Sequence, residues 1–150
     1  MRSTLYILNG PNLNLLGVRE PHLYGSTTLA QVEQLCRRVA AELNLDCEFR
    51  QTNHEGVLVD WVQEARERAA AVVINPAGLS FRSIPLLDAL KTLDQPIAEV
   101  HVTNIHRRDE IYQKSLVSLA ATGVICGFGP FGYELAIRAV AQQLACTPAG

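Results

Sequence analysis

Short apolar runs alternate with amphipathic segments along the whole chain. The apolar runs predict strands, and segments with apolar residues at helical spacing predict helices. We expect five strands, at residues 4–8, 47–52, 70–75, 97–104 and 123–129. We expect four main helices, at residues 28–43, 57–69, 83–93 and 132–145. The first helix is expected to begin with a capping box formed by Thr28 and Gln31.

Regular alternation of strands and helices is typical of an α/β fold. We expect a five-stranded parallel sheet with helices on both faces, forming a single domain over residues 1–150. The run at 70–75 is apolar almost throughout, which suits the middle of such a sheet. Ligands of these folds bind beyond the carboxyl ends of the strands, so the residues just after each strand are the candidates for a site.

Composition narrows the class of protein. The chain is 48% hydrophobic and 19% charged, which indicates a globular protein. A net charge of −2 gives no reason to expect nucleic acid or an anionic membrane as a partner. We see no signal peptide and no apolar run long enough to span a bilayer, and therefore expect a cytoplasmic protein. The four cysteines are widely spaced, which favours free thiols over a disulfide framework or a zinc site.

Asparagines follow four of the expected strands. Asparagine is common at turns for conformational reasons alone. Its amide also binds oxygen atoms without carrying a charge. Because asparagines occur after four strand ends, a polar pocket is favoured over a purely conformational role. The pocket would contain Asn12, Asn53, Asn75 and Asn104.

Two further pairs have both a catalytic and a structural interpretation. Glu99 and His101 are two residues apart on one strand, so they share a face. The carboxylate would orient the imidazole for general acid or base work, or the two would only satisfy each other as a buried pair. Arg19 and Tyr24 lie in a loop between Gly17 and Gly25, which is either a lid that favours the phenolate form of Tyr24 or a solvated loop.

Nucleotide and Schiff-base chemistry are disfavoured. The glycine-rich stretch 127–132 follows the last strand and does not match a dinucleotide fingerprint. Neither lysine, Lys91 or Lys114, ends an apolar strand.

Four motifs together resemble one known family. The stretches LNGPNLNLLGVREPHLYG, NHEG, EVHVTNIHRR and GVICGFGPFGY are similar to the type II 3-dehydroquinate dehydratases, from Leu5 to the last helix. The resemblance implies a flavodoxin-like fold, trimers that assemble into a dodecamer, and no metal or organic cofactor. It also implies a place in shikimate or quinate metabolism, where the family eliminates water from 3-dehydroquinate.

The resemblance also implies roles for individual residues. Tyr24 would be the base, Arg19 the cation that favours its phenolate, and Asn12 the residue that holds a water against the enolate oxygen. His101 would protonate the leaving hydroxyl, oriented by Glu99. Substrate contacts would come from Asn75, from the Val102 backbone and from Thr103. Asp88 would reach the site of a neighbouring subunit, and Arg108 would be an arginine on the lid side.

The chain departs from the family pattern on the substrate side. Phe81 stands where the family usually has a substrate-binding histidine, and Tyr112 and Leu87 stand where it usually has arginines. Two hypotheses follow. One is a dehydratase of 3-dehydroquinate with weakened activity, in which Arg82 or Tyr112 recovers part of the lost binding. The other is an impaired or retargeted relative that binds another cyclic hydroxy acid.

Overall fold

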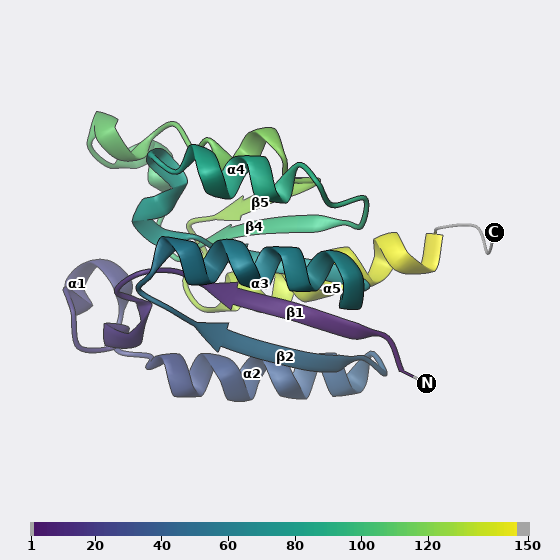
Figure 1. Cartoon of the computed structure of the whole chain (residues 1–150). Helices are drawn as coiled ribbons and strands as arrows, with labels where there is room; N and C mark the ends of the chain where they lie inside the picture. Colours follow the sequence, from purple (N-terminus) through teal and green to yellow (C-terminus); the bar gives the residue numbers. More distant parts are fainter. Residues whose placement is uncertain (1, 147–150) are drawn as a thin grey trace.

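The computed structural model describes residues 2–146, which form one five-stranded parallel sheet (Figure 1). The strands are β1 (Thr4–Asn9), β2 (Asp46–Gln51), β3 (Ala71–Asn75), β4 (Ile97–His101) and β5 (Gly123–Cys126). Their order in the sheet is β2-β1-β3-β4-β5. This is the strand order of flavodoxin-like folds, so the predicted fold class is confirmed.

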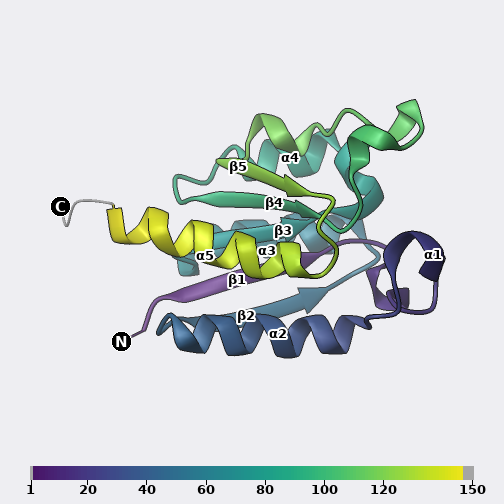
Figure 2. The ribbon, with the colours of Figure 1, turned by 180° about the vertical axis from the view of Figure 1, so that it is seen from behind.

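Helices cover both faces of the sheet, as expected. The main helices are α2 (Leu29–Glu42), α3 (Glu55–Arg68), α4 (Ile84–Leu90) and α5 (Phe131–Cys146). Figures 1 and 2 show α3 and α4 on one face and α2 and α5 on the other. None of the helices within residues 2–146 combines the length and the apolar character needed to cross a membrane.

Alternation along the strands produces the two hydrophobic cores. Leu5 and Ile7 of β1 pack into the core under α2 and α5, whereas Tyr6 and Leu8 pack into the core under α3 and α4. The expected capping box starts α2: the Thr28 hydroxyl accepts from the Gln31 backbone N–H at 3.2 Å, and the Gln31 side chain accepts from the Thr28 N–H at 2.9 Å.

Several boundaries differ from the sequence-based expectation. The strand expected over 97–104 ends at His101, because the chain then turns and Asn104 caps a 3-10 turn by accepting from the His106 backbone N–H. The strand expected over 123–129 ends at Cys126, because Gly127 has a φ of +95° and leaves the extended conformation. The helix expected over 83–93 is shorter, and Ser83 is its N-cap.

Several short helical turns were not predicted. A four-residue helix, α1 (Pro21–Tyr24), lies within the first long loop. Five 3-10 turns carry no periodic hydrophobic signal: η1 (Leu13–Leu15), η2 (Ala77–Phe81), η3 (Ile105–Arg107), η4 (Glu110–Tyr112) and η5 (Val117–Leu119). Figure 1 shows α1 beyond the arrowheads of β1 and β2.

The loops after β1 and β3 touch at Gly10. Its backbone N–H donates to the Asn75 carbonyl at 2.8 Å. A Cβ at this position would lie 2.4 Å from the Pro76 carbonyl oxygen, so only glycine permits this approach. The contact brings the residues that follow β1 beside the end of β3.

Candidate active site

A cavity of about 230 Å³ opens at the carboxyl ends of β1, β3 and β4. This is the switch point of strand order at which flavodoxin-like folds bind ligands. Ten of the predicted site residues line it: Asn12, Arg19, Tyr24, Asn75, Phe81, His101, Val102, Thr103, Arg108 and Tyr112. Pro11, Leu13, Ala77, Gly78 and Ile105 complete the lining. The structure therefore brings together residues from Pro11 to Tyr112 of the sequence.

His101 lies at the end of β4, and a buried carboxylate contacts its ring. Its Nε2 is 2.5 Å from the Glu99 carboxylate, which is fully buried. The second oxygen of Glu99 accepts a hydrogen bond from the Ser118 hydroxyl at 2.6 Å. Burial on its own raises the pKa of Glu99, but the hydrogen bonds from His101 and Ser118 outweigh it and hold that pKa below its ordinary value. The charged carboxylate thus fixes the orientation of the imidazole through Nε2, and Nδ1 is the ring nitrogen that Glu99 does not contact.

Asn75 is positioned by a buried network that the sequence did not reveal. Its Nδ2 donates to the Tyr133 hydroxyl at 2.9 Å, and that hydroxyl donates to Asn9 Oδ1 at 2.7 Å. Asn75 Oδ1 accepts from the Ala77 backbone N–H at 3.2 Å. Because Tyr133 is fully buried on α5, the amide orientation of Asn75 depends on a residue 58 positions away.

Asn12 lies on the opposite loop of the cavity in a left-handed conformation, with a φ of +69°. Asparagine is one of the few residues that tolerate this region. Its backbone N–H donates to Asn53 Oδ1 at 2.9 Å, and Asn53 also accepts from Gln51. Asn53 is therefore a support for the loop and does not line the cavity, whereas the Asn12 side chain does.

Two guanidinium groups lie close to the ring of Tyr24. The Cζ atom of Arg19 is 5.2 Å from the centroid of the Tyr24 ring, and that of Arg108 is 5.6 Å away. Arg19 also forms an exposed ion pair with Glu20 at 3.5 Å. Tyr24 and the two cations therefore lie together in the lining of the cavity.

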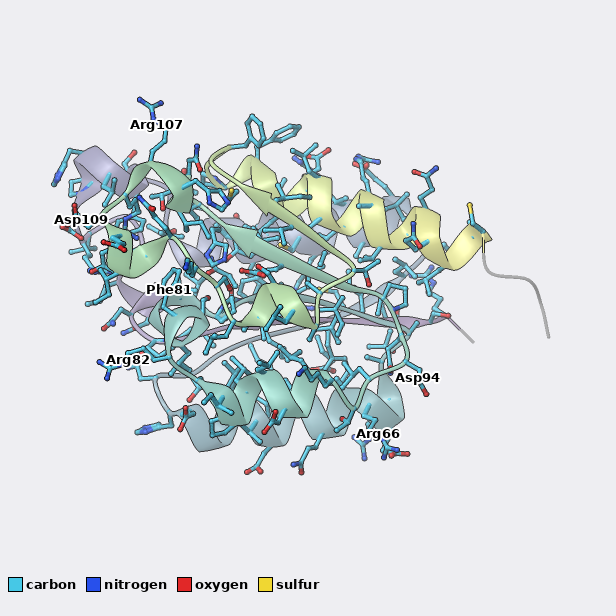
Figure 3. All side chains as sticks on the ribbon, turned by 90° about the horizontal axis from the view of Figure 1, so that it is seen from above. Arg66, Phe81, Arg82, Asp94, Arg107 and Asp109 are labelled. Atoms are coloured by element: carbon cyan, nitrogen blue, oxygen red, sulfur yellow. The ribbon has the colours of Figure 1, made fainter. Side chains whose placement is uncertain are left out.

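Phe81 and Tyr112 form an aromatic wall. Phe81 stacks on the His101 ring with 6.2 Å between centroids, and its contact with Tyr112 is edge to face at 5.5 Å. Arg82 is exposed and does not line the cavity, and Figure 3 shows it pointing away from the molecule. The suggestion that Arg82 recovers the lost substrate contact is therefore wrong for this conformation.

Three further positions that the sequence singled out lie outside the cavity. Asp88 is exposed on α4, and Leu87 beside it is buried in that helix. Asn104, one of the four asparagines after strands, caps η3. Within residues 2–146, no cluster of three or more His, Cys, Asp or Glu side chains could hold a metal ion.

Known proteins of one family are similar to this chain in sequence and in fold. The model of the family dehydroquinase class II matches residues 3–141. The 3-dehydroquinate dehydratase of Caulobacter vibrioides is 55% identical over 139 residues, which cover 93% of this chain and 95% of that protein. The 3-dehydroquinate dehydratase 1 of Agrobacterium fabrum is 54% identical over 140 residues, covering 93% and 97%.

A solved structure supports the same assignment. The type II dehydroquinase from Propionibacterium acnes superposes with a TM-score of 0.90 at 43% identity, covering 95% of this chain and 98% of that one. The resemblance stated from the sequence motifs is thus confirmed over nearly the whole chain. The chain belongs to the dehydroquinase class II family.

Proposed function

We propose that this protein dehydrates 3-dehydroquinate to 3-dehydroshikimate by an anti elimination through an enolate. The observation that carries the proposal is that an oriented imidazole, His101 on Glu99, and a tyrosine between two arginines, Tyr24, line one cavity. An elimination of water next to a ketone needs one base and one acid, and these are the two groups present. The relatives named above carry the name of this activity.

Tyr24 acts first, as the base. As a phenolate beside the guanidinium groups of Arg19 and Arg108, its oxygen removes a proton from the carbon between the ketone and the carboxylate-bearing carbon. The electron pair of that C–H bond moves into the ketone to give an enolate. The Asn12 side chain holds a water molecule against the developing enolate oxygen and stabilises the charge there.

His101 completes the elimination. It gives a proton to the hydroxyl on C1, the C1–O bond breaks, and water leaves as the C1–C2 double bond forms. Glu99 keeps the ring aimed and stabilises it when it carries the extra proton. Asn75, Thr103 and the backbone of Val102 hold the hydroxyl and carboxylate groups of the substrate.

A second candidate rests on the aromatic wall. Phe81 and Tyr112 offer ring faces on the substrate side, where the resemblance implies a histidine and an arginine. A polar group left unpaired in a pocket costs about 1–3 kcal/mol. Two such losses would lower kcat/KM on 3-dehydroquinate by about 10²–10⁴-fold. This loss would suit a relative that prefers another cyclic hydroxy acid with less polar substituents on that side.

The first test is the enone absorbance produced when purified protein is mixed with 3-dehydroquinate. We expect a sustained rise for the wild type and none for Tyr24→Phe, because phenylalanine keeps the ring and removes the base. Circular dichroism checks that the variant is folded. Unchanged turnover in Tyr24→Phe would remove Tyr24 from its role, and no turnover in a folded wild type would contradict the proposed function.

The second test separates the two candidates. The retargeted candidate predicts that Phe81→His combined with Tyr112→Arg raises kcat/KM on 3-dehydroquinate by about 10²-fold or more, because two polar contacts are regained. Arg82→Ala serves as the matched control, since Arg82 lies beside the wall and points outward. If the double variant is no faster than the wild type, the wall does not limit this reaction.

A further inference from the structure

Five side chains form a continuous stack along one wall of the cavity. The order is His101, Phe81, Tyr112, Arg108 and Tyr24. They come from β4, η2, η4, the residue after η3, and α1. The stack therefore joins the proposed acid at one end to the proposed base at the other through contacts between side chains.

Contacts with the faces of two tyrosine rings hold Arg108 within this stack. Across residues 2–146 its guanidinium forms no ion pair with a carboxylate, in contrast to Arg19, which pairs with Glu20. Its Cζ atom is 4.0 Å from the Tyr112 centroid and 5.6 Å from the Tyr24 centroid, both within the range of a cation–π interaction. Tyr112 is the nearer ring and therefore the stronger of the two contacts.

The Tyr112 ring is fixed in turn by Phe81. The two rings meet at 77° with centroids 5.5 Å apart, the edge-to-face arrangement that aromatic pairs prefer. The two aromatic residues that distinguish this wall thus contact each other, and Tyr112 in turn contacts Arg108. This contact indicates a coupled pair of positions.

We propose that Tyr112 is a positioning residue that holds the Arg108 guanidinium beside Tyr24, and that Phe81 fixes the ring of Tyr112 for this purpose. The kinetic consequence rests on the proposed function, because Arg108 acts on the reaction through its contact with Tyr24, the proposed base. The ring face of Tyr112 performs this role and its hydroxyl does not. The aromatic wall of this chain then contributes to the removal of the proton by Tyr24.

Three substitutions at or beside this position test the proposal. Tyr112→Phe keeps the ring face and should retain kcat/KM, whereas Tyr112→Leu removes the ring and should lower kcat by about 5- to 30-fold with little change in KM. Ile111→Ala, at an exposed neighbour in η4, is the matched control and should leave both constants unchanged. If Tyr112→Phe is as slow as Tyr112→Leu, the hydroxyl is the important group and the proposal is wrong.

A double-mutant cycle shows whether Tyr112 acts through Arg108. In an Arg108→Leu background, Tyr112→Leu should have no further effect on kcat, because the cation that it positions is gone. An equal additional loss in both backgrounds would overturn the proposal, since Tyr112 would then act independently of Arg108.

A spectroscopic measurement keeps the proposal testable without turnover. The Nε–H resonance of Arg108, assigned by its absence in Arg108→Leu, should be displaced by the Tyr112 ring current in the wild type and in Tyr112→Phe. It should lose that displacement in Tyr112→Leu. A resonance that does not move in Tyr112→Leu overturns the stack, whereas a moving resonance in a protein without turnover supports the stack and contradicts the proposed function.

Discussion

Glu99 shows at the residue scale how burial and hydrogen bonding compete. The carboxylate is removed from water, which disfavours its charge, yet His101 and Ser118 both contact it. Its pKa lies below the ordinary value, so the charged form is more stable in the folded chain than in the unfolded one. This difference contributes stability that depends on pH.

The sign of that dependence follows from proton binding. As pH falls, the unfolded chain takes up its proton first, near the usual glutamate value of about 4.3. The contribution is therefore fully present above about pH 4.3 and is lost as pH falls through the lower pKa of the folded state.

Glu99→Gln removes this titration, so its effect should depend on pH. We expect it to lower the free energy of unfolding by about 1–3 kcal/mol at pH 7. The gap from the wild type should narrow as the pH is taken from about 5 to about 3. Urea unfolding monitored by circular dichroism at each pH measures both effects. A gap that stays constant over this range would show that Glu99 titrates normally.

At the scale of elements, the turn between β3 and α4 carries backbone strain. Ala77 has a φ of +53°, in the left-handed region that favours glycine. The Asn75 side chain accepts from its N–H and helps to hold it there. Ala77 also lines the cavity, so the strained turn forms part of its wall.

Replacing this alanine should relieve the strain. We expect Ala77→Gly to raise the free energy of unfolding by about 1 kcal/mol, because a side chain no longer opposes the positive φ. Ala139→Gly, at an exposed position inside α5, is the matched control and should lower stability by about 1 kcal/mol. Chemical denaturation measures both, and a destabilised Ala77→Gly would mean that the turn is not strained.

The elements themselves were largely predictable, and the reason is their hydrophobic period. The apolar β3 segment and the amphipathic segments of α2 and α3 gave unambiguous signals. Turns such as η4 gave none, since three residues are too few to show a period. Tyr112 was therefore identified only through the family resemblance. Its place in the aromatic wall was not predicted.

The candidate site was predicted unevenly for a related reason. Strand ends and spacing pointed to Asn12, Asn75 and the Glu99–His101 pair, because strand geometry fixes which residues share a face or an edge. Tyr133 and Ser118 were missed, since their contacts with Asn75 and Glu99 cross from one element to another. A single sequence carries no signal for such long-range hydrogen bonds.

At the scale of the whole molecule, Asp88 bears on whether neighbouring chains share a site. It is exposed on α4 and does not line the cavity of its own chain, while the resemblance implies that it reaches a neighbouring one. We therefore expect trimers that assemble into a dodecamer, with a mass about twelve times the chain mass of 16.4 kDa.

Light scattering after size exclusion, combined with kinetics, tests this expectation. Asp88→Ala should lower kcat/KM by about 10- to 100-fold, the effect of one lost hydrogen bond to a charged group, while Asp94→Ala, at another exposed aspartate, should not. A fully active 16.4 kDa monomer would contradict both the assembly and the role of Asp88.

The contact at Gly10 limits how this cavity can change during evolution. Since the loops after β1 and β3 touch there without room for a side chain, an insertion in one loop displaces both Asn12 and Asn75. Phe81 and Tyr112 lie in η2 and η4, farther along the chain from this contact, and a substitution at either position changes the wall without changing the length of the loops at Gly10. New ligand preferences in this lineage should therefore arise by substitution in the aromatic wall, while the polar loops keep their length.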